Sequence, residues 1–270
     1  TAAVKDQSRI RYYTFVEMFD FLQDSRAEQT FNQYLPVWEG QSTAHGNRKS
    51  AVPHAPYTVS KELFQRIAAL NADDATVSIH NQETPPENEM FLHGTGAFFE
   101  FYGRFGISLE HFQAIGQPSI HYALRHLDPA RRTLFVHNTL STPDDIRAAQ
   151  AWSPHTFWAT CPNANLYIEN RLPNYRHFLD TGARVTIGTD SLTSNWQLSI
   201  LEEMKTIARF QRFVPFETML RWATLNGAEA LGFDDTLGSF EVGKTPGVLL
   251  LEGLGENGLP EAGTTVRRLV

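Results

Sequence analysis

The feature of the sequence that most constrains the fold is a regular alternation between short apolar segments and longer amphipathic segments. The short segments are mostly rich in β-branched or aromatic residues, which is typical of strands. Six strands are predicted in this way, at residues 12–18, 50–55, 76–80, 133–137, 156–161 and 184–189. Between and after them, apolar residues at three-to-four spacing predict helices at residues 20–38, 60–70, 85–105, 108–115, 142–151, 173–182, 197–210 and 215–231. Strands separated by helices predict a parallel sheet built from right-handed βα units.

The chain is long enough to bury a sizeable core, and its final segment has a different character. It contains 270 residues, of which 41% are hydrophobic and 20% are charged, and this composition excludes intrinsic disorder. The segment after residue 237 is rich in glycine and carries two short strand patterns, at 247–251 and 264–270, with no helix between them. This segment is therefore predicted to be a small β appendage of about 30 residues.

Charge, hydropathy and motif content exclude several classes of function. Lys and Arg total 23 against 30 Asp and Glu, a formal net charge of -7, so no basic surface for nucleic acid is expected. The longest apolar stretches fall far short of the roughly 20 residues that a membrane helix needs, so no membrane contact is expected. Cys161 is the only cysteine, which excludes an internal disulfide and favours a reducing, cytoplasmic compartment. The chain has neither the G-x-S-x-G motif of serine hydrolases nor a complete phosphate-binding loop.

Polar side chains lie at or directly after the ends of four of the six predicted strands. His54, His80 and His137 occupy three of these positions, and Asp190 follows the last strand. The carboxyl ends of parallel strands meet at one edge of a sheet, where α/β enzymes bind their ligands. A single histidine near a strand end is more often structural than functional. The joint pattern, however, favours an active site.

The most informative local motif is H-x-x-E, formed by His80 and Glu83 after the third strand. A neutral imidazole can bind a divalent metal, and a carboxylate three residues later is close enough to exchange protons with a water at that metal. Asp190 offers a hard anionic ligand, or alternatively caps the helix that follows. Gly188 favours the first interpretation, because a glycine leaves room for a ligand or for neighbouring backbone.

Other candidates carry less information. His137 is suited to stabilising charge on an attacked atom, and His54, between two prolines, to orienting a substrate, although each could instead hydrogen-bond a loop. Glu17, at the end of the first strand, is a weaker candidate substrate contact. The aromatic residues between 91 and 102 either line a pocket or pack a helix on the sheet, and packing is the favoured interpretation.

Taken together, these motifs resemble the metal-dependent amidohydrolase superfamily, in the branch of guanine and adenosine-type deaminases and triazine chlorohydrolases. The matching segments follow the family's order: HAPYTVS at 54–60, SIHNQE at 78–83, VHNTLS at 136–141, CPNANL at 161–166 and TIGTDSLTSN at 186–195. The segment ALGFDDTLGSFEVGKTPGVLLLE at 230–252 is similar to the family's return from the barrel to a β domain. The resemblance covers most of the chain after its first 50 or so residues.

The resemblance implies an α/β fold, a (β/α)8 TIM barrel of the amidohydrolase type, with a small β-sandwich domain and one divalent metal, zinc or sometimes iron. It implies that His80 and Asp190 are metal ligands and that Glu83 carries protons to and from the reacting groups. Asp190 would also orient the attacking water and accept its proton. His137 would polarise the substrate.

The resemblance also implies two substrate-binding residues and a reaction. His54 would contact the substrate, and Asn165 would shape the substrate-binding loop after the seventh barrel strand. The leading interpretation is a hydrolase of C–N bonds, an aminohydrolase (deaminase) that releases ammonia from a purine-like or other heteroaromatic amine. A chlorohydrolase or amide hydrolase of the same branch uses the same residues. A metal-free, non-catalytic homologue that acts as a binding protein is the alternative from a different class.

One motif of the resemblance is missing. The family places two further metal ligands as H-x-H after the first barrel strand, and no two of the ten histidines of this chain lie two residues apart. Counted backward, the six predicted strands correspond to barrel strands three to eight.

We therefore expect the chain to be the C-terminal part of a longer polypeptide, with residues 1–235 forming an N-terminally incomplete barrel and 236–270 the C-terminal part of the β domain. An H-x-H motif encoded upstream of Thr1 would support this expectation, and a stop codon there without the motif would contradict it. The expected partner is a small-molecule substrate, and the resemblance is compatible with a homodimer.

Overall fold

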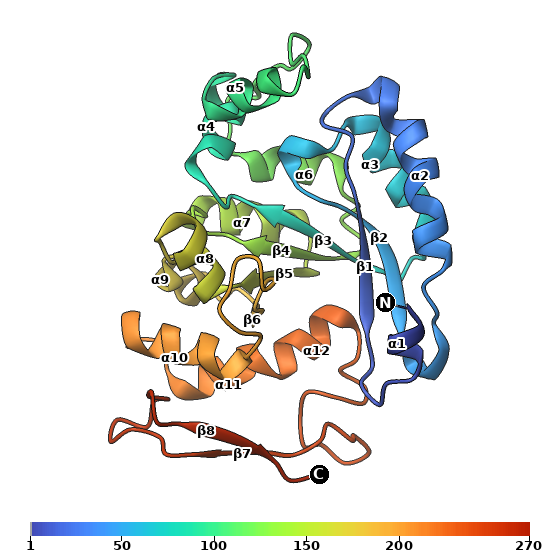
Figure 1. Cartoon of the computed structure of the whole chain (residues 1–270). Coiled ribbons are helices and arrows are strands. Elements are labelled where there is room, and N and C mark those ends of the chain that lie inside the picture. Colours follow the sequence, from blue (N-terminus) through green and yellow to red (C-terminus); the bar gives the residue numbers. More distant parts are fainter. Residues whose placement is uncertain (1) are drawn as a thin grey trace. The chain divides into compact units, whose positions relative to one another are not determined.

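The computed structural model describes residues 2–270, which form two compact units (Figure 1). The first unit holds the residues up to 135 together with 148–156, and the second holds 136–147 together with 157–270. Every predicted strand is present and begins and ends within two residues of the expected positions. Parallel strands alternate with helices, which confirms the α/β class.

The strands of the first unit are β1 (Tyr13–Met18), β2 (Arg48–Pro53), β3 (Thr76–Asn81) and most of β4 (Arg132–His137). The inner strands β2 and β3 bury residues on both faces, as expected of a parallel sheet, whereas β1 buries only Val16 and Met18. β1 pairs with β2 in parallel, with Val16 opposite Ala51. β3 continues beside β2, because the amide of His80 donates to the carbonyl of His54 at 2.9 Å. The carboxyl ends of β1, β2 and β3 are thereby brought together.

The helices of the first unit pack on these strands, with α2 against β1 and α3 against β2. They are α1 (Ala2–Asp6), α2 (Ala27–Glu39), α3 (Lys61–Leu70), α4 (Pro85–His93), α5 (Ala97–Arg104) and α6 (Ser119–His126). Short 3₁₀ turns lie at Asp24–Arg26, Ala44–Gly46 and Pro56–Thr58. The hydroxyl of Ser60 accepts from the amide of Leu63 at 3.2 Å and so caps the start of α3.

Three helix predictions in the first unit were wrong. The helix predicted from residue 20 begins only at Ala27, because Phe21 and Leu22 adopt left-handed backbone with φ of 58° and 61°. The helix predicted at 85–105 is broken into α4 and α5 by Gly94 and Gly96, with φ of 68° and 103°. No helix forms at 108–115, where the chain turns instead, and α6 was not predicted.

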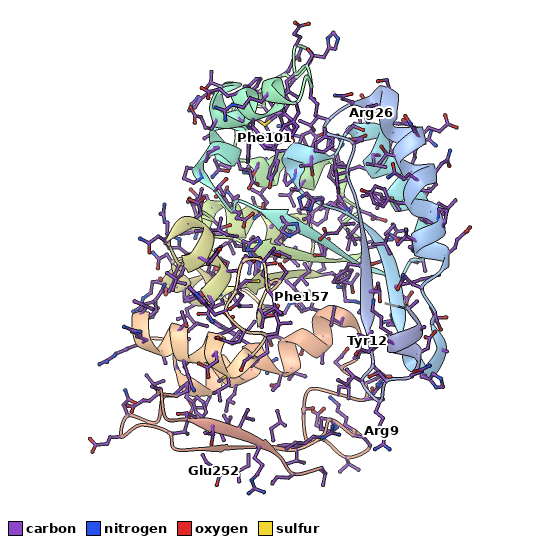
Figure 2. The ribbon with its side chains drawn as sticks, viewed as in Figure 1. Arg9, Tyr12, Arg26, Phe101, Phe157 and Glu252 are labelled. Carbon is purple, nitrogen blue, oxygen red and sulfur yellow. The ribbon has the colours of Figure 1, made fainter. Side chains whose placement is uncertain are left out.

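The aromatic residues that follow Glu83 mainly pack the first unit. Phe91 and Tyr102 are buried, and Phe91 lies edge-on to Phe112 with ring centroids 5.4 Å apart. Phe101 of α5, labelled in Figure 2, remains about half exposed. Helix packing is therefore the better interpretation of most of this aromatic run.

The second unit is built on a parallel strand pair and its helices. β5 (Thr156–Thr160) pairs with β6 (Val185–Ile187), with Ala159 opposite Thr186. The helices are α7 (Pro143–Trp152), whose first half lies in this unit, and α8 (Pro162–Glu169), α9 (Tyr175–Asp180), α10 (Ile200–Phe210), α11 (Phe216–Ala223) and α12 (Leu225–Leu231). The helix predicted at 215–231 is broken at Thr224, whose backbone leaves the helical region, and α8 was not predicted.

The C-terminal segment is a β-hairpin of the second unit, as the two predicted strands suggested. β7 (Leu249–Glu252) pairs antiparallel with β8 (Thr265–Arg268), with Leu251 opposite Val266. The connecting loop lies against α10 (Figure 1), because the ammonium of Lys205 donates to the carbonyl of Ala262 at 3.2 Å.

Candidate active site

The ends of β1, β2 and β3 bring together a carboxylate and two imidazoles. Nδ1 of His54 lies 3.2 Å from Oε2 of Glu17, and Nδ1 of His80 lies 3.9 Å from Oε1 of Glu17. The two imidazole rings have centroids 4.6 Å apart. Each of the three side chains offers a ligand atom within 4.8 Å of the others. This cluster includes Glu17, for which the sequence alone gave little support.

The orientation of His80 suits it to binding a metal through one defined nitrogen. Its Nδ1 lies 2.6 Å from the carbonyl oxygen of His54. A carbonyl can only accept a hydrogen bond, so Nδ1 carries the proton and the lone pair resides on Nε2. A backbone carbonyl that fixes the tautomer in this way is the usual support for a metal-binding histidine.

The hydrogen bond between His54 and Glu17 fixes the imidazole of His54 in a similar way. An ionised carboxylate only accepts hydrogen bonds, so Nδ1 of His54 donates to Glu17 and Nε2 is left as an acceptor. Their side chains are 31% and 43% exposed, so a ligand can reach both of them. The pair can therefore orient a group that donates a hydrogen bond.

Glu83 follows β3 in a turn whose backbone is held by a second carboxylate. The oxygens of Glu87 accept from the amides of Gln82 and Glu83 at 2.8 and 2.9 Å, and the hydroxyl of Ser119 donates to Glu87 at 2.6 Å. Glu87 is completely buried. Glu87 was not predicted from the sequence, although the T-x-x-E spacing from Thr84 is the pattern of a helix capping box.

Burial changes the acidity of Glu87. Removal from water raises the pKa of this carboxyl to about 7, against the opposing effect of its hydrogen bonds from Ser119 and the two amides. The nearby charge of Glu83 raises the pKa further. A buried carboxylate of this kind is costly to stability unless its oxygens are hydrogen-bonded.

In the second unit, the predicted residues at strand ends have an uncommon backbone conformation. His137, at the end of β4, has φ of 71°, Asn138 has φ of 59°, and Asp190 has φ of 57°. Left-handed backbone costs a non-glycine residue roughly 1–3 kcal/mol, and such residues cluster at active sites. His137 is buried, and the side-chain amide of Asn138 donates to the carbonyl of Ala159 at 3.1 Å.

Asp190 is half-buried in a turn of its own. Its carboxylate accepts from the amide of Ser191 at 2.7 Å and from the hydroxyl of Ser194. The next helix, α10, is capped by Ser199, so Asp190 does not serve as its cap. A Cβ atom at Gly188 would lie 3.3 Å from the thiol of Cys161, so the close neighbour at this glycine is a side chain.

The turn that carries Asp190 is tied to α10 and α8 through another buried carboxylate, Glu203. Glu203 accepts from the side-chain amide of Asn195 at 2.7 Å and from the backbone amide of Asn163 at 2.8 Å. The same Asn195 amide donates to the carbonyl of Thr189 at 2.6 Å. Burial raises the pKa of Glu203. Thr189, directly before Asp190, is therefore fixed to a helix of the core.

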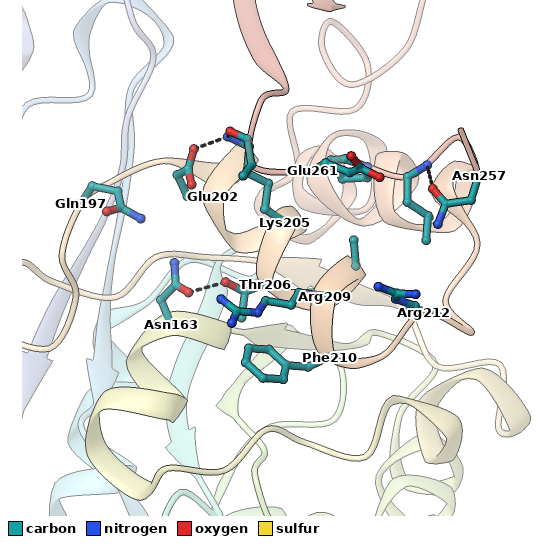
Figure 3. Close-up of a pocket in the computed structure, with 14 residues that line it drawn as sticks. Asn163, Gln197, Glu202, Lys205, Thr206, Arg209, Phe210, Arg212, Asn257 and Glu261 are labelled. Carbon is teal, nitrogen blue, oxygen red and sulfur yellow. Dashed lines mark hydrogen bonds and ion pairs between the residues drawn. The ribbon is translucent and has the colours of Figure 1, made fainter. Parts of the chain in front are cut away.

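The outer side of this network borders a pocket of about 350 Å³ (Figure 3). One wall of the pocket is formed by Asn163 and Thr206, which are joined by a 2.6 Å hydrogen bond. Asn163 also donates its backbone amide to Glu203. Lys205, Arg209 and Arg212 supply positive charge, and the loop around Pro260 supplies the opposite wall.

Asn165, the remaining predicted site residue, is buried in α8. Its amide donates to the hydroxyl of Thr139 at 2.5 Å and so joins α8 to the turn after β4. Within the part of the chain that the structure describes, its side-chain oxygen has no hydrogen-bond partner. Three predicted site residues, at positions 54, 80 and 83, therefore belong to the first unit, and those at 137, 165 and 190 belong to the second.

Comparison with known proteins identifies the family. The model of the Amidohydrolase family matches residues 3–261. The chain belongs to the amidohydrolase family. This confirms the resemblance inferred from the motifs at the strand ends.

Three proteins illustrate what this chain is similar to in sequence or in fold. The chain is 30% identical over 209 residues to a 5-methylthioadenosine/S-adenosylhomocysteine deaminase of Teredinibacter turnerae, covering 74% of this chain and 42% of that protein. An adenosine deaminase of Xanthomonas campestris with bound zinc superimposes with a TM-score of 0.67 and 26% identity, covering 93% and 54% of the two chains. Atrazine chlorohydrolase TrzN of Arthrobacter aurescens TC1, complexed with zinc, has the same fold, with a TM-score of 0.66, 20% identity, and 87% and 52% coverage.

The amidohydrolase chain spans about half the length of the relatives it matches. Within residues 2–270, every helix is too short or too polar to cross a bilayer.

Proposed function

We propose that this amidohydrolase chain carries most of the active site of a metal-dependent aminohydrolase. The reaction is hydrolysis of the C–N bond to an exocyclic amine of a purine-like or other heteroaromatic ring, with release of ammonia. The observation that carries the proposal is the fixed tautomer of His80, which leaves the lone pair of Nε2 available to bind a metal. Glu83, the proposed proton carrier, follows His80 by three residues. The similarity to deaminases of adenosine-type nucleosides supports the choice of substrate class.

The metal would be held by His80 and Asp190, together with an H-x-H pair that this chain does not contain. The donor set fits a divalent cation, because it combines an imidazole of fixed tautomer with a carboxylate. Zinc is the proposed metal, since two similar proteins were crystallised with zinc, and iron is the alternative. A bound divalent metal supplies acidity to water, lowering its pKa toward about 7.

Each side chain then transfers a proton, stabilises charge or positions the substrate. Glu83 takes a proton from the attacking water, whose oxygen adds to the ring carbon that bears the amine, and Asp190 accepts the second proton. His137 stabilises the charge that develops on the ring. Glu83 delivers its proton to the amine nitrogen, the C–N bond breaks, and ammonia leaves. The proton held by Asp190 passes to the ring nitrogen, so the ring becomes a carbonyl compound and both carboxylates are ionised again. His54 contacts the substrate, and Asn165 holds the turn that surrounds it.

The proposal extends to the organisation of the whole protein. Residues 1–235 would form the incomplete barrel, and 236–270 would be the C-terminal part of the small β domain. The protein would act in the cytoplasm on a small molecule, as a homodimer.

Release of ammonia tests the proposal directly. We expect the zinc-supplemented polypeptide that includes the proposed H-x-H pair to release ammonia from adenosine, 5'-methylthioadenosine or another aminated heterocycle in a panel, and Glu83→Gln to lower kcat by about a thousandfold. The matched control is Glu89→Gln, because Glu89 is an exposed carboxylate of α4. Absence of ammonia from the whole panel, with one metal bound per chain, would contradict the proposal.

A chlorohydrolase is the second candidate, because atrazine chlorohydrolase shares the fold. Chloride release from chlorinated triazines, without ammonia release from the amines, would favour it. A chain that binds no metal after growth with zinc or iron would instead favour a non-catalytic binding protein.

A further inference from the structure

A buried carboxylate in α4 contacts the backbone of the turn that carries Glu83. Glu87 accepts one hydrogen bond from the amide of Gln82 at 2.8 Å and one from the amide of Glu83 at 2.9 Å. The two bonds use different oxygens of the carboxylate. The backbone of these two successive residues is therefore held by a single side chain.

These contacts go beyond the ordinary capping of a helix. The residues at the first two positions of α4 are Pro85 and Pro86, which have no amide hydrogen, so the start of α4 has few donors to satisfy. The side chain of Thr84, at the cap position, makes no capping hydrogen bond. Glu87 instead bonds to residues that precede the helix and belong to the H-x-x-E turn.

The conformation of the turn needs this support. Gln82 adopts left-handed backbone with φ of 46°, which is unfavourable for a residue with a side chain. The hydroxyl of Ser119, at the start of α6, donates to the same carboxylate at 2.6 Å. Glu87 is thus anchored from a second helix, and it has no exposed surface. An exposed glutamate could cap α4 without the free-energy cost of burying a carboxylate. The complete burial of Glu87 therefore indicates that the geometry of the turn at Gln82 and Glu83 has to be fixed.

We propose that Glu87 is a positioning residue that fixes the backbone of Glu83, and hence the direction in which the Glu83 carboxylate meets the reacting groups. This inference rests on the proposed role of Glu83 as the proton carrier. Glu87 itself does not touch the substrate, because it is buried behind the turn. Displacement of a catalytic group by about 1 Å can cost about a hundredfold in rate. The two backbone hydrogen bonds of Glu87 would prevent such a displacement of Glu83.

The test combines amide hydrogen exchange with steady-state kinetics on the purified, zinc-loaded protein. Glu87→Gln keeps the size of the side chain but replaces one accepting oxygen with an amide group that cannot accept. We expect the amides of Gln82 and Glu83 to exchange at least about tenfold faster, and kcat to fall about 10- to 100-fold while KM changes less than about threefold. Glu89→Gln, in the same helix and exposed, should leave both readouts unchanged.

A second variant keeps the proposal testable if Glu87→Gln folds poorly. Ser119→Ala removes only the third hydrogen bond of Glu87 and leaves both backbone contacts possible, so we expect the same changes in the same direction but smaller. If either folded variant shows faster exchange at Gln82 and Glu83 with an unchanged kcat, the positioning role is overturned. Unchanged exchange in Glu87→Gln overturns it as well.

Failure of the proposed function would look different. If Glu83→Gln retains the ammonia release of the wild type, Glu83 is not the proton carrier, and the positioning role falls with it. If Glu83→Gln is inactive and Glu87→Gln is as active as the wild type, the proposed function stands and only the role of Glu87 is wrong.

Discussion

At the scale of single residues, one hydrogen bond decides how His80 can act. Donation from Nδ1 to the carbonyl of His54 leaves Nε2 as the nitrogen that can bind a cation, and the backbone amide of His80 donates to the same carbonyl and keeps it in place. The tautomer is therefore a consequence of how the ends of β2 and β3 lie beside each other. This links an ordinary feature of a parallel sheet to the chemistry of the proposed site.

Removal of the His80 imidazole should weaken metal binding strongly. We expect His80→Ala to lower the affinity for zinc by at least about a hundredfold, since loss of a residue that only supports a metal ligand already costs 10- to 100-fold. Metal content after dialysis against a chelator, measured by elemental analysis, checks this. His93→Ala is the matched control, because His93 is exposed at the end of α4. Retention of tightly bound zinc by His80→Ala would remove His80 from the ligand set.

Glu87 gives stability a pH dependence whose sign can be derived. Its folded-state pKa of about 7 lies above the ordinary value of 4.5, so the folded protein binds the proton more tightly than the unfolded chain does. Between pH 4.5 and 7 the unfolded chain loses this proton first, and the free energy of unfolding therefore falls as pH rises. The contribution is up to about 3 kcal/mol over that window. Above the folded-state pKa it does not change further.

Urea unfolding at a series of pH values measures this contribution. Glu87→Gln removes the titrating group. The unfolding free energy should therefore decline less between pH 5 and 7 than in the wild type, and the difference should be a large part of the contribution of Glu87. Glu89→Gln should keep the wild-type slope. Equal slopes in the wild type and Glu87→Gln would show that the buried carboxyl does not titrate in this range.

At the scale of elements, the turn after β6 depends on α10 for its position. The side-chain amide of Asn195 contacts both the carbonyl of Thr189 and the carboxylate of Glu203, at 2.6 and 2.7 Å. Because Asp190 follows Thr189 directly, loss of these bonds should free the proposed metal ligand. If Asp190 binds the metal, these hydrogen bonds hold its turn in the position that binding requires.

Asn195→Ala should therefore reduce zinc affinity about 10- to 100-fold while the protein still folds. Competition with a coloured chelator measures the affinity, and Asn32→Ala, an exposed asparagine of α2, is the control. If Asn195→Ala binds zinc as tightly as the wild type, either Asp190 is not a ligand or its turn holds its shape without Asn195.

The elements also show which parts of the structure the sequence could predict. The strands were predicted closely, because a parallel strand is a short apolar run that local composition reveals. Helix ends were predicted less well, because apolar periodicity continues across Gly94 and Gly96, where the backbone adopts positive φ. Histidines and carboxylates at strand ends could be singled out from the sequence. The role of Glu87 could not, because its burial depends on Ser119, which lies 32 residues later.

At the scale of the whole molecule, the C-terminal hairpin either unfolds together with the rest of the second unit or folds as a separate domain. The loop between β7 and β8 buries Leu259 and Pro260, and Lys205 of α10 donates to the carbonyl of Ala262. By its contacts, the hairpin belongs to the same compact unit as β5, β6 and α10. A segment attached in this way should unfold together with the core of that unit.

Leu259→Ala tests whether the segment after residue 235 is a separate folding unit. Trp158 and Trp222 are buried in the second unit, so their fluorescence follows the unfolding of its core. If the hairpin is integral to that core, Leu259→Ala should lower the unfolding free energy reported by these tryptophans by about 2 kcal/mol. Leu254→Ala, at a more exposed leucine of the same loop, should lower it by less than about 0.5 kcal/mol. An unchanged tryptophan transition in Leu259→Ala, with a separate transition at lower urea, would instead show that residues 236–270 fold as a domain of their own.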